Sequence, residues 1–349
     1  MILSSGEIYF IGEYDVKTDT RSEYFKIGIV RHGGKDNRNS LDRLLEHQTG
    51  NPRRLEIVHV IEADAVEGIE TSLHHMFSPH RVYGEWLKLD QKLFKEVVNQ
   101  AEQLKLDMSQ YKSKFEAAEL LDDVLSIDGK VNPDLDAEFW YEKFSLANFR
   151  GQACDEVITE YKELRMKEQQ EGKDVTAFLS VQTKAGRKIF DAEGFREKYP
   201  ELYSKFSSST KRIKGSFRPN TNNPKFKTAL LLDIDPQLAT KISSFRASIG
   251  DTDSLTMQSE VHNKFLEIES ELAFAEWEKE LAKVHLKNLC GSAEGINGVC
   301  SWKRTEVVEE KLDEKGLKEA FPAEVQEFIS VGAESKAYIL ETRSAYKEG

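Results

Sequence analysis

The chain has few cysteines, few prolines and no long hydrophobic run. Its 349 residues include only three cysteines, too few for a disulfide framework at this length and typical of a reducing compartment. No apolar run approaches the roughly 20 residues that a membrane-spanning helix needs, and the first residues lack the charged and apolar parts of a leader. We therefore expect a cytoplasmic protein with no membrane partner, long enough for two or three domains.

The chain also lacks a recognisable zinc motif. His285, Cys290 and Cys300 are three possible ligands near a Gly-rich turn. Their spacing matches no zinc finger or ribbon, and no fourth ligand presents itself. Ordinary thiols beside a turn are the preferred interpretation.

Positive charge is scarce overall and concentrated in one segment. The net charge of -12 argues against a protein that coats nucleic acid through its overall field. Residues 181–230, however, carry 12 basic and 4 acidic side chains. Basic residues interleaved with Phe217 and Phe226 could supply phosphate contacts and stacking to DNA, although a solvated face is the alternative. These candidate DNA-binding residues are Lys211, Arg212, Lys214, Arg218, Lys225 and Lys227.

The first 90 residues have the pattern of a small α+β unit. Apolar alternation and β-rich composition indicate three strands, and two segments have helical spacing, the first with Ser40 placed as its N-cap. The expected strands lie at 7–14, 23–30 and 53–63, and the expected helices at 40–48 and 65–77. A long loop separates the first two strands, and residues 81–89 close the unit.

The rest of the chain is expected to be mainly α-helical. We divide it into a helical linker domain, 91–180, and a basic segment with a helical DNA-targeting domain, 181–349, with no internal repeat. Residues 228–250 have the order of elements of a ribbon-helix-helix motif. The alternative interpretation is an ordinary core strand followed by a helix. A long helix over 257–289 is a core element or the interface of a homodimer.

Five short motifs follow one another in the first unit: IYF, FKIG, RLLEHQTGNP, ETSLHHMF and RVYGEW. In this order they resemble the GIY-YIG endonuclease superfamily, in the branch from bacteriophage and bacterial reading frames where KIG replaces YIG. The resemblance covers about residues 6–90. It implies a three-stranded antiparallel sheet flanked by helices, and hydrolysis of phosphodiester bonds with Mg²⁺ or Mn²⁺.

The resemblance also implies roles for residues of the strands and the first helix. Tyr9 would take or position the proton of the attacking water, and Lys26 could lower the pKa of Tyr9. A half-buried strand tyrosine and a solvated strand lysine are the alternatives. Arg43 and His47 share one face of their helix, opposite its leucines, and would act on the phosphate charge and the leaving group. Gly28 would allow a close backbone approach.

The metal is assigned to the second helix. Glu70 flanks the apolar stripe, whereas Glu67 points further out by helical angle. A carboxylate at the rim of a core needs compensation, which Mg²⁺ would supply. Glu70 matches the family's metal-binding glutamate, and His74 matches a histidine that binds substrate or packs.

Together these patterns predict a metal-dependent DNA endonuclease aimed at its target by the basic and helical C-terminal region. The alternative from another class is a noncatalytic DNA-binding or protein-interaction module built on a degenerate GIY-YIG scaffold. The asparagine that many family members carry after the glutamate is missing, and Glu85 and Trp86 stand near its place.

Overall fold

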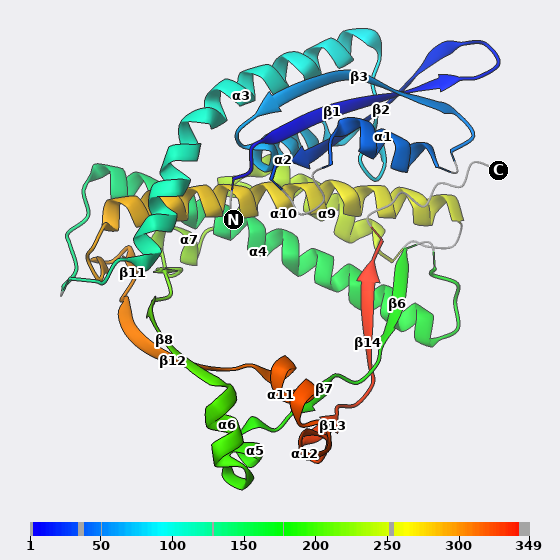
Figure 1. The fold of residues 1–349 in the computed structure, drawn as a ribbon. Helices are drawn as coiled ribbons and strands as arrows, with labels where there is room; N and C mark the ends of the chain where they lie inside the picture. Colours follow the sequence, from blue (N-terminus) through cyan, green and yellow to red (C-terminus); the bar gives the residue numbers. More distant parts are fainter. Residues whose placement is uncertain are drawn as a thin grey trace.

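The computed structural model describes residues 3–33, 38–49, 51–127, 129–176, 178–250 and 255–341. An N-terminal sheet lies above two long helices, and two β-ribbons connect this body to a distal lobe (Figure 1). No helix in these ranges is long and apolar enough to span a membrane.

The N-terminal sheet has five antiparallel strands in the order β3-β1-β2-β5-β4. Its strands are β1 (Gly6–Asp15), β2 (Thr20–Arg31), β3 (Arg54–Ala63), β4 (Arg81–Tyr83) and β5 (Trp86–Lys88). The expectation of three strands was therefore wrong. The RVYGEWLKL segment turns at Gly84, which has a φ of 52°, and its second arm pairs with the free edge of β2. The long loop expected after β1 is also a short turn, because the strands extend toward each other and Asp15 caps the turn by accepting from the Lys17 and Thr18 N–H groups.

Two helices flank the sheet, α1 (Ser40–Gln48) and α2 (Val66–Met76). Asn39, and not Ser40, is the N-cap of α1, in a capping box with Asp42. Helix α2 buries Val66, Ile69 and Leu73 in the core of the sheet, as its apolar stripe predicts.

The long helices are α3 (Gln91–Leu120), α4 (Leu135–Gln170) and α10 (Leu255–Cys290), with α9 (Pro236–Ser248) beside them. Trp277 of α10 enters the core of the N-terminal sheet. Gly68 of α2 makes room for it, since a Cβ there would lie 2.6 Å from the Trp277 ring. The N-terminal unit thus completes its core with a helix from the far end of the sequence.

The strand expected at residues 228–234, in the ribbon-helix-helix interpretation and in its alternative alike, is absent. Residues Leu231–Ile234 form the short helix α8 rather than a strand. Helix α9 follows directly, and the Asp235 side chain caps its N-terminus. The shorter elements of the body are η1 (Ser78–His80), η2 (Leu121–Asp123), α7 (Pro224–Lys227), β9 (Arg218–Pro219), β10 (Gly295–Ile296) and β11 (Cys300–Ser301).

The described residues of 181–341 are more helix than strand, as expected, but three two-stranded pairings that the sequence did not predict also bring two distant segments together. The pairs are β6 (Leu179–Lys184) with β14 (Ser335–Leu340), β7 (Lys188–Phe190) with β13 (Ile329–Val331), and β8 (Ser207–Lys214) with β12 (Thr305–Leu312). Four short helices complete the distal lobe: α5 (Ala192–Lys198), α6 (Pro200–Phe206), α11 (Glu314–Ala320) and α12 (Pro322–Gln326). The lobe has its own core, around Phe195, Leu317 and Val325.

The lobe is an internal repeat, which corrects the expectation of none. Residues 190–206, FDAEGFREKYPELYSKF, align with residues 312–328, LDEKGLKEAFPAEVQEF. In each copy an aspartate caps the first helix: Asp191 accepts from the Gly194 N–H and Asp313 from the Gly316 N–H, both at 3.0 Å. The copies also exchange equivalent bonds, because the Asp191 N–H donates to the Phe328 carbonyl and the Asp313 N–H to the Phe206 carbonyl, both at 2.9 Å. The lobe therefore has approximate two-fold symmetry. Only five of the 17 aligned positions are identical, which hides the repeat in the sequence.

Candidate active site

Tyr9 lies at the centre of the candidate site. It sits on β1 directly opposite Gly28 of β2 and is 1% exposed. A Cβ on Gly28 would lie 2.4 Å from the Tyr9 hydroxyl oxygen. The glycine therefore leaves the space that the tyrosine ring and hydroxyl occupy. The alternative of a half-buried strand tyrosine does not describe this side chain, which is fully buried.

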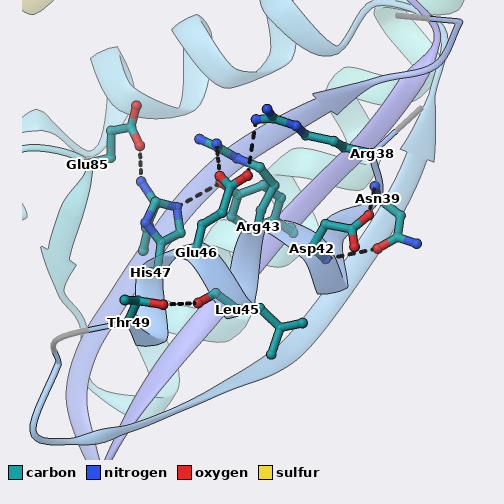
Figure 2. Close-up of polar contacts among 11 residues, drawn as sticks. Arg38, Asn39, Asp42, Arg43, Leu45, Glu46, His47, Thr49 and Glu85 are labelled. Atoms are coloured by element: carbon teal, nitrogen blue, oxygen red, sulfur yellow. Dashed lines mark hydrogen bonds and ion pairs between the residues drawn. The ribbon is translucent and has the colours of Figure 1, made fainter. Parts of the chain in front are cut away.

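Helix α1 turns a polar face toward Tyr9. His47 Nε2 lies 3.5 Å from the Tyr9 hydroxyl, and the positive charge of Arg43 acts on that hydroxyl. Leu44 packs on the same side, beside Tyr9, while Leu41 and Leu45 are more than half exposed. The helix thus does not bury all three leucines opposite Arg43 and His47, because its polar residues find partners at the sheet. Figure 2 shows Arg43, Leu45 and His47 along α1.

Arg43 is held by a neighbouring carboxylate. It pairs with Glu46, one turn further along α1, and Arg38 approaches the same carboxylate at 3.1 Å. Because Arg43 is partly exposed, its guanidinium can reach an anion arriving from solvent. Its position beside Tyr9 agrees with a role as donor to a phosphate.

Lys26 is not a solvated strand lysine, since it is 5% exposed. Its ammonium forms an ion pair with Glu85, whose own side chain is 48% exposed. Glu85 lies in the turn between β4 and β5, next to Trp86, which pairs with Lys26 across the strands. The GEW motif in the sequence pointed to this place without assigning Glu85 a role.

Glu70 projects from α2 into the same cluster. Burial raises its pKa to about 7, the charge of Glu85 adds to the rise, and Lys26 opposes it. No hydrogen bond or ion pair joins Glu70 to any residue in the described ranges. This carboxylate is therefore half-buried, without an ionic partner among the described residues, and accessible to a cation.

Glu67 does not point into solvent as its helical angle predicted. It forms an ion pair with Arg31 at 2.6 Å and accepts from the Ser4 N–H at 3.0 Å, and its side chain is mostly buried. These partners lower the pKa of Glu67 although burial opposes them. Glu67 and Glu70 thus share a helix, but the first is satisfied and the second is not.

Protonation states differ from the expectation for Tyr9. Burial raises the pKa of its hydroxyl, and Arg43, rather than Lys26, is the cation that opposes the rise. The pKa of His47 is lowered by burial and by the charges of Lys26 and Arg43. At neutral pH the site therefore pairs a protonated tyrosine with a neutral imidazole that can accept a proton.

His74, one turn after Glu70, is buried, and neither ring nitrogen has a hydrogen-bond partner of good geometry within the described residues. The backbone of Ile27 approaches the ring without completing such a bond. Burial and the charge of Arg81 lower the pKa of His74 to about 4, so the ring is neutral. The sequence identified this histidine, and the structure adds that its polar atoms are unsatisfied.

The basic segment is largely paired with acidic residues away from the sheet. On the β8/β12 ribbon, Lys211 contacts Glu306 at 2.8 Å, and Arg212 and Lys214 both approach Glu309. In the body, Lys225 pairs with Glu142. The local excess of positive charge in the sequence is therefore mostly balanced in three dimensions.

The remaining candidates of this segment differ. Arg218 and Lys227 have no ion pair with a described residue. Phe217 packs edge-on against Trp302, and Phe226 packs against Phe149, so both rings already have aromatic neighbours. The six basic residues do not form one patch around the rings.

No zinc site forms at the positions considered. Among the described residues there is no group of three His, Cys, Asp or Glu side chains that could hold a metal ion. His285 instead stacks on Trp140 with ring centroids 3.6 Å apart. Cys290 and Cys300 are buried free thiols.

Comparisons with known protein families, with curated proteins and with solved structures find no match for this chain. The chemistry therefore has to be argued from the site. Its five expected residues converge: Tyr9, Lys26, Arg43, His47 and Glu70. They provide a half-buried carboxylate, a neutral base, a protonated hydroxyl and two cations in one place.

Proposed function

We propose that the chain is a metal-dependent DNA endonuclease of the GIY-YIG type. The observation that carries this proposal is Glu70, a half-buried carboxylate without a hydrogen-bond partner in the described residues, placed among the side chains that would surround a scissile phosphate. Such a carboxylate is costly in a folded protein unless a cation or proton compensates it.

Glu70 would hold the Mg²⁺ or Mn²⁺. The donor set suits these ions, since one protein carboxylate leaves most ligand positions to water and phosphate. When bound, the ion supplies charge stabilisation at the phosphate and acidifies its bound water.

The chain's own residues then divide the remaining work. His47 is neutral and accepts the proton of the attacking water, while the Tyr9 hydroxyl, 3.5 Å from Nε2, orients it. Arg43 donates to the charge that develops on the phosphate oxygens. Lys26 is a second cation for that charge once it is released from Glu85.

Supercoiled plasmid tests this proposal. Purified protein should nick it with Mg²⁺ and leave it intact with EDTA. Plasmid that stays intact with Mg²⁺ at high protein excess, yet shifts in a gel, would support the noncatalytic alternative. The ion pair between Lys26 and Glu85 is the one observation in favour of that alternative, because it closes the site in the free protein.

A further inference from the structure

Glu85 differs from the other acidic residues of the site because it comes from the outer edge of the sheet. It follows Gly84, whose φ is 52°, in the turn between two three-residue strands. Strand β4 is the end of the sheet, but the backbone of the turn is held, because the Gly84 carbonyl accepts from Arg81 and the Glu85 carbonyl accepts from the Ile27 N–H at 3.3 Å. The Glu85 side chain is half exposed, so it can change rotamer without moving this backbone.

The Glu85 carboxylate nevertheless reaches into the centre of the site. It contacts the ammonium of Lys26, and its charge acts on His47 and His74. Figure 2 places it at the His47 end of α1. The side chain is thus half exposed at its base and surrounded by the groups that would receive a phosphate.

The sheet places Glu85 beside Lys26, because Trp86 pairs with Lys26 across the strands and the Glu85 carbonyl accepts from the Ile27 N–H. Lys26 and Glu85 are 59 residues apart in sequence. A buried lysine needs an anion, and in the free protein the only one in contact with it among the described residues is Glu85.

We propose that Glu85 is an internal substitute for the substrate phosphate. Its carboxylate neutralises Lys26 in the free protein, and an incoming phosphate replaces it there while the Glu85 side chain swings outward into solvent. The exchange of one anion for another keeps the buried ammonium paired throughout. This inference rests on the proposed function, since it assigns the regulation of the same site.

The competing role for Glu85 is a second metal-binding carboxylate beside Glu70. The two roles predict different effects on DNA binding without metal. Removing a competing anion strengthens the binding of phosphate, whereas removing a metal ligand leaves metal-free binding unchanged.

The experiment measures equilibrium binding of a short fluorescein-labelled DNA duplex in EDTA at low salt. Glu85→Gln keeps an acceptor for Lys26 while removing the charge, and it should bind roughly two- to fivefold more tightly than the wild type, the range that a half-exposed ion pair supplies. Glu56→Gln is the matched control, because Glu56 is a similarly exposed, ion-paired carboxylate on β3. The control removes the same charge and should change the affinity little.

A second readout does not depend on DNA. Inorganic phosphate should raise the melting temperature of Glu85→Gln more than that of the wild type, since ligand stabilisation grows with affinity. If Glu85→Gln fails to fold, Glu85→Asp keeps the charge on a shorter side chain and should also bind the duplex more tightly than the wild type. Affinities of the Glu85 variants equal to that of Glu56→Gln would overturn the proposal.

Neither readout uses cleavage, so the two proposals fail separately. If Glu85→Gln binds DNA more tightly but the plasmid stays intact, the nuclease proposal is wrong and the anion-exchange proposal is supported. If Mg²⁺-dependent nicking occurs but Glu85→Gln binds DNA as the wild type does, the nuclease proposal is supported and the anion-exchange proposal is wrong.

Discussion

Tyr9 and Gly28 face each other across β1 and β2, and the tyrosine hydroxyl occupies the place of the missing glycine side chain. Gly28→Ala would put a methyl group 2.4 Å from that hydroxyl. We expect a loss of about 1–3 kcal/mol in the free energy of unfolding, the usual cost of overpacking, and a displaced Tyr9.

Denaturant unfolding measures this loss. Gly250→Ala is the control, because a Cβ there would have no atom within 4 Å. Equal stability of the two variants would show that the Tyr9 ring does not lie against Gly28.

The raised pKa of Glu70 predicts a pH dependence of stability. The folded protein holds this proton up to a pKa of about 7, above the ordinary value of 4.5. The stabilisation from this group is therefore complete below about pH 4.5 and is lost as the pH rises through 7. This pKa shift corresponds to a loss of unfolding free energy on the order of 3 kcal/mol at high pH. Glu70→Gln should not show this loss, so it should be more stable than the wild type at pH 8.

Thermal unfolding between pH 5 and pH 8 tests this dependence, without metal. The wild type should lose stability faster than Glu70→Gln over that range. Parallel curves for the two proteins would mean that Glu70 is not buried in an uncompensated state.

The two copies of the repeat predict equal effects of equivalent mutations. A Cβ on Gly194 would lie 2.4 Å from the Asp191 carboxylate, and one on Gly316 would lie 2.4 Å from that of Asp313. Each Gly→Ala change should break one helix cap and cost about 1–2 kcal/mol of lobe stability. Hydrogen exchange of the lobe amides measures both, and a large effect in one copy only would contradict the symmetry.

The ribbon charges give a prediction about DNA targeting. If β8 binds DNA, its lysines must leave Glu306 and Glu309 to do so. The double variant Glu306→Gln, Glu309→Gln should then bind DNA more tightly. Replacing Lys211, Arg212, Lys214 and Arg218 should make the salt dependence of binding shallower. The slope of the log binding constant against log salt concentration should fall by about 0.9 for each lost phosphate contact. Titrations at several salt concentrations decide the matter, because unchanged slopes would leave these residues with a purely structural role.

The sequence predicted the order of elements in the first 90 residues well, because alternation and helical spacing are local signals. It also predicted which five side chains converge, through the order of the motifs. It did not predict that Arg43 and His47 of α1 are half-buried at the sheet while Leu41 and Leu45 are more than half exposed. The orientation of α1 depends on Tyr9 of β1, and the periodicity of the helix sequence carries no information about that partner.

The other features that the sequence did not predict depend on pairing between segments far apart in the chain. The β4–β5 hairpin is too short to show a clear alternation, and its place depends on the free edge of β2. Strands β6 and β14 lie about 150 residues apart in sequence and are largely exposed, so they carry no core pattern. The acidic partners of the basic segment likewise come from distant residues, Glu142, Glu306 and Glu309.

The most direct test of the central claim is the single-turnover cleavage of labelled DNA with Mg²⁺ by the wild type, Glu70→Gln and Glu56→Gln, with DNA binding measured in parallel. The account predicts cleavage by the wild type and by Glu56→Gln at similar rates, and a loss on the order of 10²-fold or more for Glu70→Gln with its DNA binding nearly unchanged. Cleavage by Glu70→Gln at the wild-type rate would contradict it.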